Sequence, residues 1–164
     1  MSMFRRTIAI GPLVVGAALL AGCAATPQAP VGPVADGVRP GSQEDLVQNV
    51  GDRIFFDFDR ADLRGTGARV ANNMATLDRQ SAWLAKFAQN NVQIAGNCDE
   101  RGTEEYNLAL GQRRAFTMRN YIVGKGIAGT RITTISFGKE RPTALGSNED
   151  AWSQNRNAIM ALRE

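Results

Sequence analysis

The sequence predicts an α/β (α+β) sandwich in which helices cover one small mixed sheet. Short apolar runs with the composition of strands alternate with longer stretches whose apolar residues recur at helical spacing. The predicted order is strand, helix, strand, helix, strand, short helix and strand, and such alternation favours crossovers between parallel strands. Roughly 115 residues are left for this domain, which is enough for one small core.

The first 22 residues have the pattern of an export signal. Arg5 and Arg6 precede a short apolar run that ends in small residues. The run is too short and too rich in Gly and Ala to predict a membrane span. It ends in Leu-Ala-Gly-Cys23, which resembles the lipobox of bacterial lipoproteins. We therefore expect residues 1–22 to be a signal peptide and Cys23 to be lipidated. An ordinary signal with an incidental cysteine is the alternative.

Residues 23–43 are predicted to be a tether, because they hold four prolines and almost no charge. The globular domain is then residues 44–164. Ala24 follows the cysteine, where enterobacterial lipoproteins retained in the inner membrane carry Asp. The lipobox resemblance thus implies a lipid anchor in the outer membrane, with the domain facing the periplasm.

Composition argues against several classes of function. The chain has 19 basic and 16 acidic residues, and loss of residues 1–22 leaves 17 and 16, so bulk charge does not indicate nucleic-acid binding. The absence of histidine makes a zinc site improbable and removes the usual base of a hydrolase. If Cys23 is lipidated, Cys98 has no partner within the chain. We expect Cys98 to be a half-buried small hydrophobe, with a disulfide between chains as the alternative.

The first strand is predicted at residues 53–59, RIFFDFD, because this run is short, aromatic and bounded by charge. In a continuous strand Asp57 and Asp59 would share one side, while Phe56 and Phe58 would face the other.

The remaining elements follow the same signals. After a Gly-Thr-Gly loop, a helix is predicted at about 73–89, where Leu77, Leu84 and Phe87 form a stripe that faces the core. The later elements are a strand at 92–95, a helix at 104–123, a strand at 131–137, a short helix capped by Asn148, and a strand at 158–162.

Residues 97–114, NCDERGTEEYNLALGQRR, lie where a strand hands over to a helix. Free N–H groups at a helix start attract anions, and ligands often bind beyond the carboxyl ends of strands. Thr103 or Glu104 is expected to cap the helix. On charge and position alone, both a ligand site and a solvated connecting loop fit this stretch.

The pattern DERGT-x-x-YN-x-x-LG-x-RRA, with FFDFDRADL before it and SQNR after it, resembles the OmpA-like peptidoglycan-binding domain. The likeness spans about residues 54–162. Within that family, the lipobox and the Pro-rich tether are most similar to those of the peptidoglycan-associated lipoproteins. The resemblance implies non-covalent binding of the peptidoglycan stem peptide through its meso-diaminopimelate.

The resemblance also assigns the site. Asp99 matches the acid that binds the ammonium of diaminopimelate, and Arg114 matches the arginine that binds its carboxylate. Arg101 and Arg113 are expected to form surface salt bridges rather than to contact the ligand. The residues that match neighbours lining the cleft are Asp59, Asn97, Gly102, Thr103 and Asn107.

Spacing alone does not bring Asp99 and Arg114 together, since Arg114 would lie ~16 Å along a straight helix. A break near Gly111, or a return of the chain, must do so. Three features depart from the family pattern: Cys98 beside the acid, Asn157 in place of an arginine, and a longer segment between residues 59 and 92.

The resemblance implies a binding protein rather than an enzyme, with no cofactor. It would tie the outer membrane to the cell wall within the Tol–Pal system, support envelope integrity and cell division, and have periplasmic TolB as a partner. Two alternatives stay open. One is an adaptor that binds only proteins. The other is a peptidoglycan hydrolase with a carboxylate pair drawn from Asp57, Asp59, Asp99 and Glu100.

Overall fold

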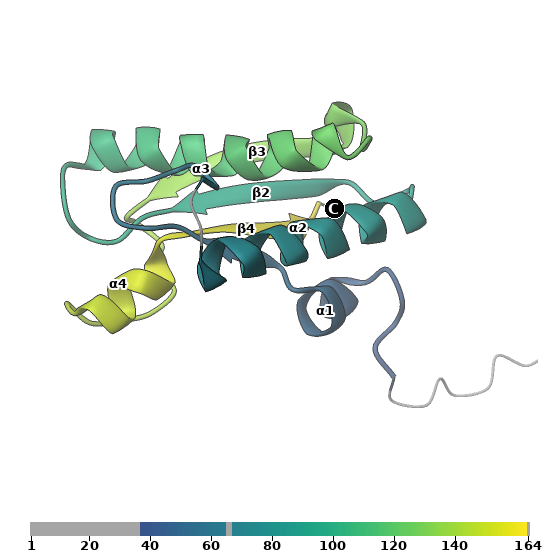
Figure 1. The fold of residues 1–164 in the computed structure, drawn as a ribbon, viewed down its shortest axis with the longest axis horizontal. Coiled ribbons are helices and arrows are strands. Elements are labelled where there is room, and N and C mark those ends of the chain that lie inside the picture. The colour runs from purple at the N-terminus through teal and green to yellow at the C-terminus, as the bar shows by residue number, and fades with distance from the viewer. Residues whose placement is uncertain (1–36, 65–66, 164) are drawn as a thin grey trace, which may run out of the picture. The chain divides into compact units, whose positions relative to one another are not determined.

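The computed structural model describes residues 37–64 and 67–163 (Figure 1). The predicted signal peptide, the predicted lipidation site Cys23 and most of the predicted tether lie outside these residues. Within the described part of the chain, no helix is both long enough and apolar enough to cross a membrane.

Four strands form one mixed sheet, which confirms the predicted fold class. Their spatial order is β1-β4-β2-β3. β2 and β3 are parallel and are joined by a helical crossover, whereas β4 runs antiparallel to both of its neighbours. The strands are β1 (Arg53–Phe55), β2 (Val92–Asn97), β3 (Ile132–Gly138) and β4 (Asn157–Leu162).

Two long helices, α2 (Ala68–Lys86) and α3 (Glu104–Gly124), cover one face of this sheet (Figure 1). Their apolar residues and those of the covered strand faces form a single core, and removing this surface from water is the main stabilising contribution. Fully buried members of the core include Ile54, Leu77, Leu84, Ile94, Met118, Ile122 and Met160.

A short helix that was not predicted precedes the sheet. α1 (Gln43–Asp45) is capped by Ser42 and continues as a π-helical turn at Leu46–Val50, whose Leu46 is fully buried in the core. The Asn90 side chain donates to the carbonyl oxygen of Gly41 at 2.8 Å, so the chain contacts the domain from Gly41 onward. The segment is too short to show a helical period in the sequence.

The first strand is shorter than predicted. β1 ends at Phe55, and residues 57–60 form a turn in which the N–H of Arg60 donates to the carbonyl of Asp57. Asp59 has a φ of 56°, which a strand does not allow. The predicted alternation of sides is therefore wrong: Phe56 is 1% exposed, whereas Phe58 is 57% exposed.

The ends of α2 also differ from the prediction. The helix begins at Ala68 and stops at Lys86, because Phe87 leaves the helical region with φ −107° and ψ 73°. A 3₁₀ turn (Gly129–Arg131) precedes β3. α4 (Glu149–Asn155) begins as predicted, with the Asn148 side chain accepting from the N–H of Ala151 at 2.9 Å.

α3 packs closely against β2, so that residues in the middle of α3 lie beside the C-terminal end of this strand. A Cβ on Gly96 would overlap the carbonyl oxygen of Gly111, so the two backbones touch here and both positions require glycine. α3 runs through Gly111 without a break. Of the two routes open from the sequence, the return of the chain across β2 is the one that brings Arg114 back toward Asn97.

Cys98 follows β2 and is buried more deeply than predicted. Its side chain is 3% exposed, and its thiol donates to the carbonyl of Asn107 at 3.4 Å. Burial raises the pKa of the Cys98 thiol. The thiol is therefore protonated at neutral pH and is a poor nucleophile.

Gly96→Ala should destabilise the domain, because the new methyl group would meet backbone rather than a movable side chain. We expect the free energy of unfolding to fall by about 1–3 kcal/mol, seen as a lower midpoint in urea. Gly124→Ala is the control, since a Cβ there meets nothing within 4 Å and alanine favours the helix by up to ~1 kcal/mol. Equal stability of the two variants would contradict the packing of α3 on β2.

The Cys98 thiol should react at least roughly tenfold more slowly with a disulfide reagent such as DTNB in the folded protein than in urea. A Cys23→Ser background restricts the signal to Cys98. Rapid reaction without denaturant would show that the Cys98 thiol is accessible to solvent and would contradict its buried position in the structure.

Candidate functional site

A cavity of about 190 Å³ lies where β2 hands over to α3, beside the turn that follows β1. Asp99 and Arg114 both line it, so the structure brings the predicted acid and the predicted guanidinium into one hollow. Three other predicted residues line it as well: Asp59, Gly102 and Asn107. The rest of the lining is Phe58, Cys98, Arg101, Tyr106 and Leu110.

The Arg114 guanidinium is fully buried and is held by three backbone carbonyls. Nε donates to Arg60 at 2.8 Å, Nη1 to Asn97 at 2.7 Å and Nη2 to Asp57 at 3.2 Å. A guanidinium carries five N–H groups, so two are not used by these bonds. Burial lowers the pKa of Arg114, yet an arginine at neutral pH keeps its charge.

Arg114 forms no ion pair with an acid of residues 37–64 or 67–163. Burying a charge without an opposite charge is costly, and carbonyl dipoles offset only part of that cost. A carboxylate entering the cavity would supply the opposite charge and could accept two N–H bonds side by side. The site is therefore suited to a ligand that carries a carboxylate.

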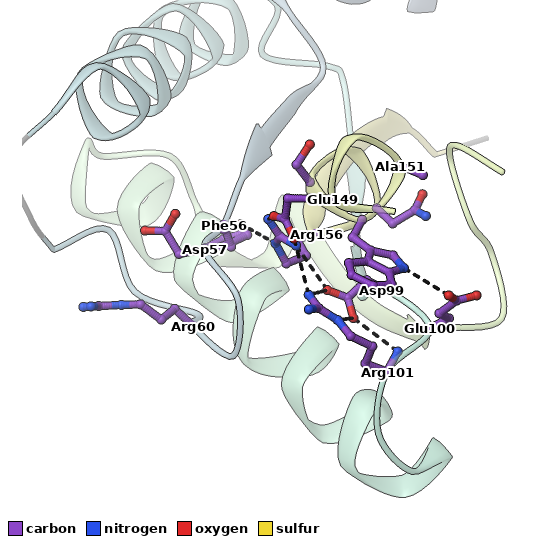
Figure 2. A network of polar contacts seen from close by, with 12 residues as sticks. Phe56, Asp57, Arg60, Asp99, Glu100, Arg101, Glu149, Ala151 and Arg156 are labelled. Carbon is purple, nitrogen blue, oxygen red and sulfur yellow. Dashed lines mark hydrogen bonds and ion pairs between the residues drawn. The ribbon is translucent and has the colours of Figure 1, made fainter. Parts of the chain in front are cut away.

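Asp99 is 4% exposed and lies between two guanidinium groups (Figure 2). Its Oδ1 accepts from the backbone N–H and the Nε of Arg101 at 3.2 and 3.1 Å. Its Oδ2 accepts from Nη2 of Arg101 at 2.7 Å and from Nη1 of Arg156 at 3.3 Å. Burial acts to raise the pKa of Asp99, but these bonds outweigh it and lower the pKa below the usual 3.8. Asp99 is thus ionised at neutral pH.

Arg156 fixes Asp99 from the interior. Its side chain is 3% exposed, its Nε donates to the carbonyl of Phe56 at 3.1 Å, and its Nη2 pairs with Glu149 at 2.5 Å (Figure 2). Sequence reasoning did not place Arg156 at the site. The only signal was its position in the SQNR motif, which gives no indication that it reaches Asp99 across the fold.

Arg101 covers Asp99 from the solvent side, with a side chain that is 32% exposed. Its guanidinium carbon lies 4.0 Å from the ring centroid of Phe58 and 4.1 Å from that of Trp152. The predicted salt bridge of Arg101 exists, but its partner is the key acid itself. Arg113 has no ion pair among the described residues and instead lies 5.9 Å from the ring centroid of Tyr106, so that part of the prediction is wrong.

The loop between Asp99 and α3 is shaped by three of the predicted residues. Gly102 has a φ of 92°, a conformation that favours glycine. Thr103 caps α3 by accepting from the N–H of Tyr106 at 3.2 Å. The Asn107 side chain donates to the carbonyls of Arg101 and Thr103 at 2.8 and 3.0 Å. Thr103 does not line the cavity; it holds the loop that does.

The other two predicted neighbours of the site, Asn97 and Asp59, have different roles. Asn97 is buried and does not line the cavity, but its carbonyl holds Arg114 and its side chain donates to Asn157 at 2.8 Å. Asn157, which departs from the family pattern, therefore positions Asn97. Asp59 accepts from the hydroxyl of Tyr106 and joins the turn after β1 to α3.

Comparison with known proteins places this chain in a family. Residues 55–156 match the model of the OmpA family. The chain is 47% identical to a peptidoglycan-associated lipoprotein of Rhizobium meliloti over 165 residues, which cover 96% of this chain and 90% of the relative. It is 41% identical to one of Haemophilus influenzae over 120 residues, 73% of this chain and 74% of the relative.

A solved structure extends the likeness to three dimensions. The crystal structure of the peptidoglycan-associated lipoprotein from Burkholderia pseudomallei superposes with a TM-score of 0.64 at 35% identity, covering 73% of this chain and 100% of that one. The match to the family model, the identity with relatives over most of the chain and the shared fold lead to one conclusion: the chain belongs to the OmpA family.

Proposed function

We propose that this chain binds peptidoglycan without a covalent bond, by holding the diaminopimelate of the stem peptide between Asp99 and Arg114. One observation carries the proposal. Arg114 is a fully buried guanidinium that lines a cavity and has no acidic partner in the described part of the chain, while an ionised Asp99 lines the same cavity.

The free end of diaminopimelate has the matching chemistry. It carries an ammonium and a carboxylate on one carbon, so it presents both charges within a few ångströms. Arg114 would take the carboxylate through its two unused N–H groups, and Asp99 would take the ammonium. A hydrogen bond to a charged group contributes about 1.5–3 kcal/mol to binding. A ligand that carries only one of the two charges would lose the hydrogen bonds to either Asp99 or Arg114, and would therefore bind more weakly.

The relatives support the wider role. Proteins named peptidoglycan-associated lipoprotein match most of this chain. We infer that the chain is lipidated on Cys23 and anchored in the outer membrane, with residues 44–164 in the periplasm. There it would tie the membrane to the wall within the Tol–Pal system, with TolB as a partner and a role in cell division.

The structure gives little support to a hydrolase. Asp57 pairs with Arg69 at 3.0 Å, and Glu100 accepts from the Trp152 ring N–H at 3.0 Å. A glycosidase needs one carboxyl with a raised pKa to act as the acid. The pKa of Asp99 is shifted in the opposite direction.

Binding to purified sacculi that contain diaminopimelate tests the proposal. Asp99→Asn should reduce the bound fraction at least roughly tenfold, because it removes the charge that meets the ammonium. Glu140→Gln, which neutralises an exposed acid in the loop after β3, is the control and should bind like wild type. Unchanged binding by Asp99→Asn would refute the site.

Arg114→Lys should also lose binding, since a lysine keeps the charge but cannot reproduce the planar donor set. Arg113→Lys, at the exposed neighbouring position, is its control. Thermal unfolding of each variant separates loss of the ligand contact from loss of the fold. Binding to TolB without binding to sacculi would favour the adaptor, and release of soluble muropeptides would favour the hydrolase.

A further inference from the structure

The carboxylate of Asp99 has no acceptor position left for a ligand. A carboxylate offers about four lone-pair positions. Three are filled by Arg101, through its backbone N–H, Nε and Nη2, and the fourth is filled by Arg156. A ligand ammonium can therefore reach Asp99 only if one of these donors leaves.

The two arginines differ in how firmly they are held. Arg156 is 3% exposed and has two further partners, the carbonyl of Phe56 and the carboxylate of Glu149. The Arg101 side chain is 32% exposed, its Nη2 lies 4.0 Å from Glu149, and its other contacts are the faces of Phe58 and Trp152. Arg101 is therefore the donor that can leave, and Arg156 is the one that keeps Asp99 in place.

We propose that the Arg101 side chain occupies the position that a ligand ammonium would take on Asp99, and that ligand binding displaces it. This inference rests on the proposed function. A guanidinium and an ammonium compete for one carboxylate, so Arg101 is a built-in competitor that the ligand must expel from between Phe58 and Trp152 (Figure 2 shows Arg101 on Asp99).

The charge balance of the cavity favours this exchange. Arg101 and Arg156 both pair with Asp99 and Glu149, whereas Arg114 has no acidic ion-pair partner in the described part of the chain. A zwitterion that replaces Arg101 brings a positive charge for Asp99 and a negative charge for Arg114. An amine alone would displace Arg101 but leave Arg114 unpaired. Only a ligand that carries both charges therefore replaces Arg101 on Asp99 and also supplies the anion that Arg114 lacks.

Titration of the purified full chain with a soluble stem tripeptide ending in meso-diaminopimelate tests the inference. Arg101→Gln removes the competitor and should bind the tripeptide about two- to fivefold more tightly than wild type, as expected for loss of a partly exposed ion pair. Arg113→Gln removes the same charge from an exposed neighbouring surface and should not change the dissociation constant. Equal or weaker binding by Arg101→Gln, relative to Arg113→Gln, overturns the inference.

Failure of the inference and failure of the proposed function give different results. If wild type does not bind the tripeptide, or if Asp99→Asn binds it equally well, the proposed function itself fails. If wild type binds, Asp99→Asn does not, and Arg101→Gln gains nothing, only the role of Arg101 is wrong.

The fluorescence of Trp152 provides a second measurement. It should not change on ligand binding if the salt bridge between Arg101 and Asp99 stays intact. Binding should change the Trp152 fluorescence of wild type, because the guanidinium leaves the ring face, and the change should be absent in Arg101→Gln. Trp152→Phe identifies the signal against the buried Trp83. An identical fluorescence change in wild type and Arg101→Gln would show that the arginine stays in place.

Discussion

The burial of one guanidinium organises this site. Arg114 on α3 binds the carbonyls of Asp57 and Arg60 in the turn after β1, and the carbonyl of Asn97 at the end of β2. Three segments far apart in the chain are thus joined by a single side chain. Because carbonyl dipoles offset only part of the cost of a buried charge, the fold leaves this cation in need of an anion. The proposed binding site and the local stability of the fold therefore depend on the same group.

The proposed selectivity of the site depends on how its charges are arranged rather than on their number. Asp99 is held on one side by the buried Arg156 and on the other by the more exposed Arg101. The interior arginine fixes the position of the carboxylate, and the outer arginine pairs with it from the solvent side. Such an arrangement avoids an unpaired buried acid. Under the proposed function, it also means that a ligand must compete with Arg101 for Asp99.

Periodicity predicted the fold class and the order of the main strands and helices. The meeting of Asp99 with Arg114 was predicted only through the resemblance of a specific motif to the family. Sequence reasoning missed what depends on contacts between distant segments. Arg156 reaches Asp99 only because β4 lies between β1 and β2, and the left-handed Asp59 ends a strand that the aromatic pattern extended. The contact of Gly96 with Gly111 is also tertiary, so spacing could not decide between a broken helix and a returning chain.

The most direct test of the two-charge site uses the wild-type protein and two ligands. Titration with a stem tripeptide ending in meso-diaminopimelate is compared with titration by the same tripeptide ending in L-lysine, which keeps the ammonium but lacks the second carboxylate. If Arg114 binds that carboxylate, the lysine peptide should bind roughly ten- to a hundredfold more weakly. Equal affinity for the two peptides would show that the buried guanidinium does not recognise the ligand.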